Sequence, residues 1–193
     1  MNTTLSLEQA PPSRGRGRWQ LILILLVVIG PMLLATAMYQ WRFWVPDSRN
    51  YHGELIGTGQ SRDDLGVQGA DETRWQVLVT APQACAEDCQ QLIYLARQIQ
   101  IGLNRDASRA THGLAVAQPL AQEHDQRLQR EYPQLGRYTL NPEAYGKVAG
   151  PAAGAQLWIV DPHGNLVLRY DATVMGKAVL NDLRHLLKLS QIG

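Results

Sequence analysis

The sequence predicts an α/β domain with a mixed sheet and flanking helices, preceded by one N-terminal transmembrane helix. Three observations lead to this fold class: an apolar run of spanning length, short β-branched segments alternating with helical-period segments after it, and a cysteine pair between the first such strand and helix. The chain has 193 residues and a net charge of +1, from 18 basic and 17 acidic residues. This balance offers no basic surface for nucleic acid.

The N-terminal part reads as a membrane anchor. Residues 1–18 are polar and include an Arg-Gly-Arg-Gly-Arg run, so we expect a disordered cytoplasmic tail. Residues 19–41 form the expected transmembrane helix, with aromatic residues at both ends as interfacial belts. The arginine bias places the N-terminus in the cytoplasm and the globular part outside, across a bacterial inner membrane. A signal peptide cleaved after Ala37 is the alternative, and it also exports the rest of the chain.

The rest of the chain divides into a tether and a folded domain. Residues 42–74 are rich in Gly and Asp, and we expect a juxtamembrane tether with a short strand near 53–57. The domain spans 75–193. Within it we expect strands at 75–80, 113–117, 137–140, 156–160 and 165–170, helices at 85–102, 118–132 and 175–189, and a loop at 147–155. Asp161-Pro162-His163-Gly164 is a turn signal that makes the last two strands a hairpin.

Cys85 and Cys89 are the only cysteines and lie at the start of the first expected helix. Unpaired N–H groups and the helix dipole favour a thiolate there. Residues four apart on a helix have Cβ atoms about 5–6 Å apart, which suits Cu(I) or, with local unwinding, a disulfide. Glu87 and Asp88 between them disfavour a thiolate but help to hold a cation, although acids are common in first helical turns. The alternative is a pair that only packs or forms an inert bridge.

The order of strand, cysteine pair at a helix start, β-α, hairpin and closing helix resembles a thioredoxin-like domain. A Cys-x-x-x-Cys pair on a membrane-tethered domain of this type resembles the Sco/SenC family of cytochrome c oxidase assembly factors. The hairpin segment 157–170, Leu-Trp-Ile-Val-Asp-Pro-His-Gly-Asn-Leu-Val-Leu-Arg-Tyr, and the C-terminal segment 180–193 are similar to the corresponding parts of Sco-like proteins. The resemblance covers the chain from Trp75 to its end.

This resemblance implies a periplasmic copper-handling protein. Cys85 and Cys89 would bind Cu(I) and pass it to the oxidase subunit that carries the binuclear copper site, or act with other oxidase assembly factors. The family's third ligand is a histidine in the loop before the hairpin, and here that loop, 150–155, has none. His124 follows a strand on the edge where the cysteines lie, so it is the best-placed substitute, with an ordinary surface histidine as the alternative.

Three functions therefore remain open from the sequence. The first is a metallochaperone for the oxidase, which is not an enzyme. The second is a thiol-disulfide oxidoreductase that keeps the target's cysteines reduced, with Cys85 and Cys89 as its catalytic residues. The third is a non-catalytic assembly scaffold. Of the other histidines, His52 lies in the tether, His163 in a turn and His185 on a solvated helix face, whereas His112 precedes a strand and is expected on the edge of the sheet away from the cysteines. No phosphate-binding loop, serine elbow or zinc motif is present.

Overall fold

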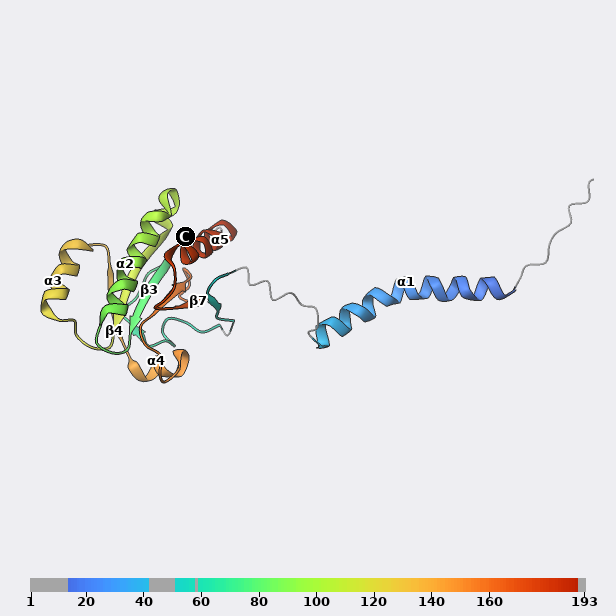
Figure 1. Ribbon diagram of the computed structural model, residues 1–193, viewed down its shortest axis with the longest axis horizontal. Coiled ribbons are helices and arrows are strands. Elements are labelled where there is room, and N and C mark those ends of the chain that lie inside the picture. Colours follow the sequence, from blue (N-terminus) through green and yellow to red (C-terminus); the bar gives the residue numbers. More distant parts are fainter. Residues whose placement is uncertain (1–13, 42–50, 58, 191–193) are drawn as a thin grey trace, which may run out of the picture. The chain divides into compact units, whose positions relative to one another are not determined.

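The computed structural model describes residues 14–41, 51–57 and 59–190. It divides into two compact units, Met1–Ser48 and Arg49–Gly193, which we describe separately. The first unit contains helix α1 (Arg14–Trp41). The elements of the second unit are β1 (Glu54–Leu55), β2 (Val67–Gln68), β3 (Trp75–Ala81), α2 (Glu87–Gly102), the 3-10 helix η1 (Asn104–Arg109), β4 (Ala110–Val116), α3 (Gln122–Glu131), β5 (Gly136–Leu140), α4 (Pro142–Ala149), β6 (Gln156–Val160), β7 (Leu166–Asp171) and α5 (Gly176–Leu189) (Figure 1).

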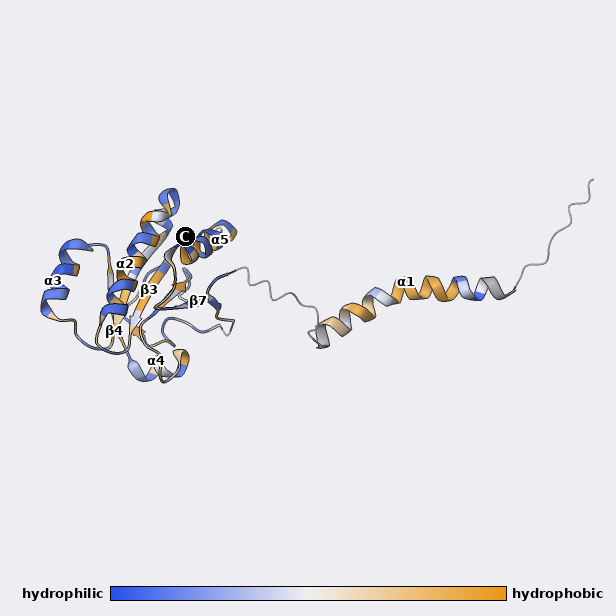
Figure 2. Cartoon of the chain, in the orientation of Figure 1, coloured by the Kyte–Doolittle hydropathy of each residue, from blue (hydrophilic) through white to orange (hydrophobic). Residues whose placement is uncertain are grey.

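Helix α1 is long and apolar enough to cross a membrane. Its stretch Gly17–Met38 has 22 residues and a mean hydropathy of 2.7, and Figure 2 shows it as mostly apolar, with a hydrophilic turn near its start and a paler turn in its middle. At 1.5 Å per residue this stretch is about 33 Å long, close to the hydrocarbon thickness of a bilayer. A signal sequence shares this length and apolar composition, so α1 is compatible with both the transmembrane anchor and the cleaved signal peptide. The helix begins at Arg14, so the expected tail, 1–18, is helical from that residue, and residues 1–13 lie outside the described part.

The second unit is built on one mixed sheet in the order β1-β7-β6-β3-β4-β5-β2. Strands β3, β4 and β5 are parallel, whereas β6 runs antiparallel to β3 and β7 runs antiparallel to β6. All seven residues of β3 are buried, because this strand is central and covered on both faces. The expected fold class, a mixed sheet with flanking helices, is therefore confirmed.

Each face of the sheet has its own apolar core. On one face, α2 and α5 bury Leu92, Ile99 and Leu183 against alternate residues of β3. On the other face, Tyr145 of α4 packs with Leu65 and Trp158. Strand β3 contributes Val77 and Val79 to the first core and Leu78 to the second, as the two-residue period of a strand requires. The helices are amphipathic, with apolar and polar residues on different sides (Figure 2).

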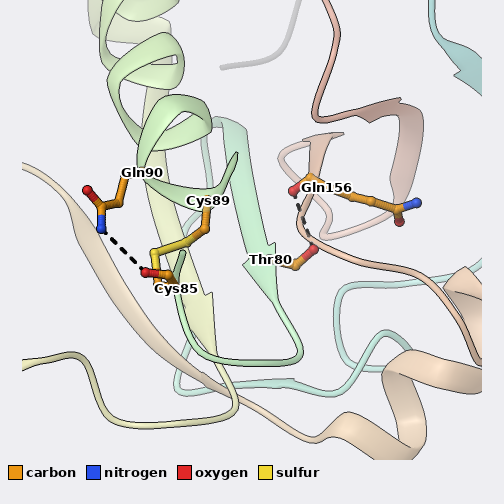
Figure 3. The surroundings of a disulfide bond; sticks show 5 residues. All are labelled: Thr80, Cys85, Cys89, Gln90 and Gln156. Atoms are coloured by element: carbon orange, nitrogen blue, oxygen red, sulfur yellow. Dashed lines mark hydrogen bonds between the residues drawn. A yellow bond between two sulfur atoms is a disulfide. The ribbon is translucent and has the colours of Figure 1, made fainter. Parts of the chain in front are cut away.

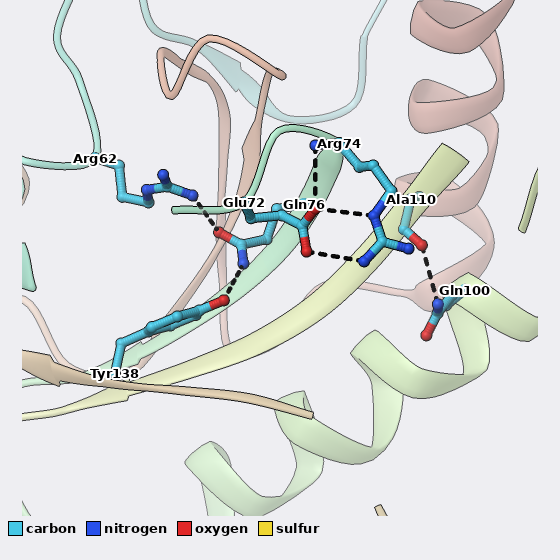
Figure 4. A network of polar contacts seen from close by, with 7 residues as sticks. All are labelled: Arg62, Glu72, Arg74, Gln76, Gln100, Ala110 and Tyr138. Atoms are coloured by element: carbon cyan, nitrogen blue, oxygen red, sulfur yellow. Dashed lines mark hydrogen bonds and ion pairs between the residues drawn. The ribbon is translucent and has the colours of Figure 1, made fainter. Parts of the chain in front are cut away.

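The segment expected to be a tether, 42–74, is part of the fold where the structure describes it. Strand β1 pairs with β7 and β2 pairs with β5, so this segment supplies both edge strands. Arg62 is 7% exposed; its Nη1 donates to Gln76 Oε1 at 3.3 Å and its Nη2 to Ala70 O at 2.7 Å (Figure 4). Strand β1 lies within the short strand expected near 53–57. Strand β2 was not foreseen, because a strand of two residues carries almost no periodic signal.

Other boundaries also differ from expectation, among them the start of α3, which lies at Gln122 rather than at residue 118. Helix α2 starts at Glu87 rather than Cys85, and β4 starts at Ala110 rather than Gly113. Helix α4 occupies part of the expected loop 147–155. Its start was signalled by Asn141, whose side chain accepts hydrogen bonds from the N–H groups of Glu143 and Ala144, and by a proline at the first helical position.

Substitution of Gly66 tests how much the contact between the segment before β3 and helix α4 contributes to stability. A Cβ at Gly66 would lie 2.8 Å from Ala144 Cβ and 2.9 Å from Asn141 O, and its φ is +85°. Gly69 has a similar φ of +80° but no atom within 4 Å of such a Cβ. We expect Gly66→Ala to lower the free energy of unfolding by about 3 kcal/mol and Gly69→Ala by about 1 kcal/mol. Equal effects in urea unfolding would show that the close contact with α4 contributes nothing.

Candidate functional site

Cys85 and Cys89 form a disulfide, with Cα atoms 5.1 Å apart. Cys85 lies in the loop after β3 and Cys89 lies in the first turn of α2, so the bridge joins the carboxyl end of a central strand to a helix start (Figure 3). Because Cys85 is outside the helix, the two sulfur atoms approach without a distorted helical turn. The local unwinding that we expected for a disulfide is thus a later helix start, at Glu87 instead of Cys85.

The two sulfur positions differ in accessibility. Cys89 is 2% exposed and belongs to the core beneath α2, whereas Cys85 is only partly buried. Ala86, the N-cap of α2, has no side chain to cap the helix. The N-terminal N–H groups of α2 thus have no capping oxygen and, with the helix dipole, favour negative charge at this end. A thiol here can act as a nucleophile or as a leaving group.

The exposed acids Glu87 and Asp88 lie between the cysteines in the first turn of α2. Their carboxylates oppose the thiolate that the helix end favours, and they would attract a cation. Gln90 Nε2 lies 3.5 Å from the Cys85 carbonyl oxygen, a contact that joins the loop to the helix (Figure 3). The site therefore combines a disulfide, a helix end and local negative charge.

A buried polar network, not foreseen from the sequence, lies where β3 approaches β6. Trp158 Nε1 donates to Thr80 Oγ1 at 3.0 Å, and the Tyr145 hydroxyl donates to Gly154 O at 2.9 Å. Thr80 and Gln156 are register partners at the ends of β3 and β6 (Figure 3). This network fixes the end of the strand that leads to the cysteine loop. Thr80 and Tyr145 gave no sequence signal because each is compatible with an ordinary strand or helix.

His124 lies near the start of α3 and is partly buried. Burial, followed by the positive charge of Arg127, lowers its pKa. Among the described residues, no three His, Cys, Asp or Glu side chains form a group that could hold a metal ion. The structure therefore does not bring His124 together with Cys85 and Cys89 as a ligand set, and the expected third ligand stays a prediction without structural support.

The remaining histidines occupy distinct places. His52 Nδ1 lies 2.8 Å from Asp182 Oδ1, and the His52 ring is largely exposed. His163 is an exposed turn residue of the hairpin, as expected, and its N–H donates to Asp161 Oδ1. The His185 ring lies edge-on to Tyr51 at 5.5 Å between centroids. None of these three has a cysteine among the interactions described for it.

His112 is the exception, because it is a buried histidine in the middle of β4. It is 3% exposed, and neither ring nitrogen has a hydrogen-bond partner among the described residues. Burial, with a smaller effect from the Arg97 charge, lowers its pKa from 6.5 to about 4. The imidazole is thus neutral at pH 7. As expected, it lies away from the cysteine edge of the sheet; its burial was not foreseen.

The buried His112 predicts a loss of stability in acid. Its pKa is about 4 in the folded chain and 6.5 when unfolded, so the unfolded state binds more protons between these values. Stability is retained above pH 6.5 and falls as the pH drops toward 4, by about 3 kcal/mol in total. His112→Phe should remove this part of the pH dependence. Urea unfolding of the unchanged protein and of His112→Phe at pH 7 and pH 4 measures this change in the free energy of unfolding. Equal losses in the two proteins would exclude His112 as the cause.

A mixed sheet whose central strand leads into a cysteine pair at a helix start defines a thioredoxin-like dithiol/disulfide domain. The family model described as the transmembrane-like, thioredoxin-like, C-terminal domain matches residues 75–190, more than half of the chain. The chain belongs to this family. A second model, the transmembrane-like N-terminal domain, matches residues 11–42. No curated protein matches the chain.

Several solved structures share the fold at low identity. Copper-bound ScoI of Arabidopsis thaliana has 11% identity and a TM-score of 0.48, and the match covers 62% of this chain and 87% of that one. Apo Sco1 of Thermus thermophilus has 16% identity, a TM-score of 0.47 and coverages of 70% and 96%. A putative protein disulfide isomerase from Bacteroides thetaiotaomicron has 11% identity and a TM-score of 0.46, and the match covers 61% of this chain and 76% of that one. Likenesses at this level carry no argument about function.

Proposed function

We propose that this protein is a membrane-anchored thiol-disulfide exchange protein that serves the assembly of cytochrome c oxidase. The observation that carries the proposal is the Cys85–Cys89 disulfide, placed between a buried strand and the start of α2 with one sulfur partly accessible. A bridge that closes a loop of only a few residues contributes less to stability than one that joins distant segments. A redox role accounts for it better than a structural role does.

The difference in burial assigns the two cysteines different roles. In the dithiol form, the Cys85 thiolate attacks a disulfide of the target, a mixed disulfide forms, and one target sulfur leaves as a thiolate. The Cys89 thiolate then attacks Cys85 Sγ, which closes the Cys85–Cys89 bond and releases the second target thiolate. The target gains two electrons and the pair loses two. A dithiol reductant must then reduce the pair for another cycle.

The location and the target belong to the same proposal. Helix α1 anchors the chain in the bilayer, its N-terminus faces the cytoplasm and the thioredoxin-like domain lies in the periplasm, where disulfides form. The target is the oxidase subunit that carries the binuclear copper site. Its two copper-binding cysteines must be reduced before the metal can enter, because thiolates are the ligands.

Exchange with oxidised glutathione tests the proposed reaction. We expect the reduced full chain, in detergent micelles, to reduce about one glutathione disulfide per chain and to end with the Cys85–Cys89 bond. Thiol counting and mass spectrometry measure both products. A chain that stays reduced, or that stops as a stable glutathione adduct, would contradict an exchange function. The chain with both cysteines changed to serine is the control.

Copper binding by the reduced pair is the second candidate. Two sulfur ligands suit Cu(I), and the exposed carboxylates of Glu87 and Asp88 beside them add attraction for a cation. Titration of the reduced full chain with Cu(I), against a competing chelator, tests this candidate. One tightly bound ion that is lost in both Cys85→Ser and Cys89→Ser would support it. Loss in His124→Ala as well would make His124 the third ligand.

A further inference from the structure

A groove of about 810 Å³ lies at the opposite end of the sheet from the cysteine pair. Strands β3 and β4 are parallel, and Cys85 follows the carboxyl end of β3, whereas the groove lies at the amino end of β4. Side chains from α2, η1, β4 and the segment after α3 line it, among them Arg97, Gln100, Ser108, His112 and Tyr132. Its volume lies in the usual range for small-molecule sites.

The charge of this groove is positive. Of the residues that the structure describes, Arg74 and Arg97 line it and no Asp or Glu does. Arg74 is already neutralised, because its Nε lies 2.8 Å from Glu72 Oε1 and its Nη2 lies 3.0 Å from Glu72 Oε2 (Figure 4). Arg97 stacks over the Tyr132 ring at 4.8 Å and has no acidic partner among the described residues. The groove therefore contains one cation without a counter-charge, held in place by an aromatic ring.

His112 supplies the second, independent observation. It is more than nine-tenths buried, it lines the groove, and both ring nitrogens are without partners within the described ranges. Thr111 Oγ1, from the same strand, is also buried and unpartnered there. A buried polar group without a hydrogen-bond partner is destabilising, so an imidazole in this state favours a ligand that hydrogen-bonds it. A neutral imidazole offers one donor and one acceptor.

We propose that this groove binds a small organic acid, with its carboxylate on the Arg97 guanidinium and a hydroxyl group on the His112 imidazole. A guanidinium prefers planar, two-oxygen anions. One part of the wall, formed by Ile101, Ala107, Pro133 and the Tyr132 ring, is apolar and suits a hydrocarbon or aromatic body. The site is independent of the exchange chemistry of Cys85 and Cys89, so either can fail without the other.

Nitrogen NMR of the histidine rings tests the site directly. The probe is 3-phenyllactate, which has a carboxylate, a neighbouring hydroxyl and an aromatic body, and the sample is the full chain in detergent micelles with ring-labelled histidine. We expect a saturable shift of the His112 ring signals, identified by their loss in His112→Phe, with a Kd of about 1 mM or below. The methyl ester of the probe, which lacks the negative charge, should bind at least about ten-fold more weakly.

Two arginine variants test whether the probe binds in the groove or acts through a nonspecific effect of the acid. Arg97→Gln should raise the Kd at least about ten-fold, whereas Arg130→Gln, an exposed arginine of α3 that does not line the groove, should leave it unchanged. Arg97 is partly exposed and outside the apolar core, so its variant should fold. No saturable shift at about 10 mM probe would overturn the proposal. Equal binding by Arg97→Gln, or tighter binding of inorganic phosphate, would overturn it too.

Discussion

Cys89→Ser should accumulate a mixed disulfide through Cys85, and Cys85→Ser should not. Cys89 is the resolving residue in the proposed exchange, so its loss leaves the first covalent intermediate without the thiolate that releases it. Cys85 is the accessible sulfur, and the remaining Cys89 is 2% exposed. We expect the yield of adduct to differ by at least about a hundred-fold between the two variants, since a buried thiol reacts slowly.

Non-reducing electrophoresis of membranes from cells that express each variant measures this asymmetry. The double serine variant gives the background level of adduct. Treatment with a reductant must cleave the adduct, because it is a disulfide. Equal adducts from both variants would mean that burial does not assign the roles. Adducts from Cys85→Ser alone would mean that Cys89 attacks the target first and that Cys85 is the resolving residue.

Asp182→Ala should be among the most destabilising single changes in the domain. Asp182 is 2% exposed on α5, and its Oδ2 accepts from the N–H groups of His52 and Gly53 at 2.7 and 3.2 Å and from the Tyr170 hydroxyl at 2.8 Å. Burial, together with this hydrogen bond, raises the pKa of Tyr170, so the hydroxyl keeps its proton. Without the carboxylate, these three donors lose their acceptor and His52 Nδ1 loses its contact with Oδ1, and we expect a loss of about 3 kcal/mol.

Two further variants isolate the cause. Asp182→Asn retains an oxygen that can take the place of Oδ2, so its loss should be smaller, about 1 kcal/mol. Asp63→Ala, at an exposed acid of the same unit, should change stability by less than about 0.5 kcal/mol. Urea unfolding followed by tryptophan fluorescence compares them. If Asn were as costly as Ala, the charge itself and not the three acceptor contacts would stabilise this end of the fold.

The sequence predicted the central strands and the long helices because their signals are local. β3, β6 and α5 have strong apolar patterns, and their positions agree with expectation to within one residue. Strand β2 and the pairing of β1 with β7 depend on partners 71 to 115 residues away, which no local period records. The same holds for the contacts of His52 with Asp182.

The candidate site was predictable in its residues but not in its geometry. Cys85 and Cys89 stood out as the only cysteines, whereas the helix start at Glu87, which separates an accessible sulfur from a buried one, depends on the loop conformation. His124 was favoured from strand order alone, and tertiary packing places it in no ligand cluster within the described part of the chain. His112 was expected at a remote edge, and its burial follows from the packing of α2 and η1 against β4.

The reduction potential of the Cys85–Cys89 pair tests the central claim most directly. It is measured on the full chain in micelles by equilibration with glutathione or dithiothreitol buffers and mass spectrometry of the trapped thiols. An exchange protein requires a potential above about −300 mV, within reach of cellular dithiols, and we predict such a value. A potential well below about −300 mV would mean a bridge that stays closed under physiological conditions, and would identify the pair as structural.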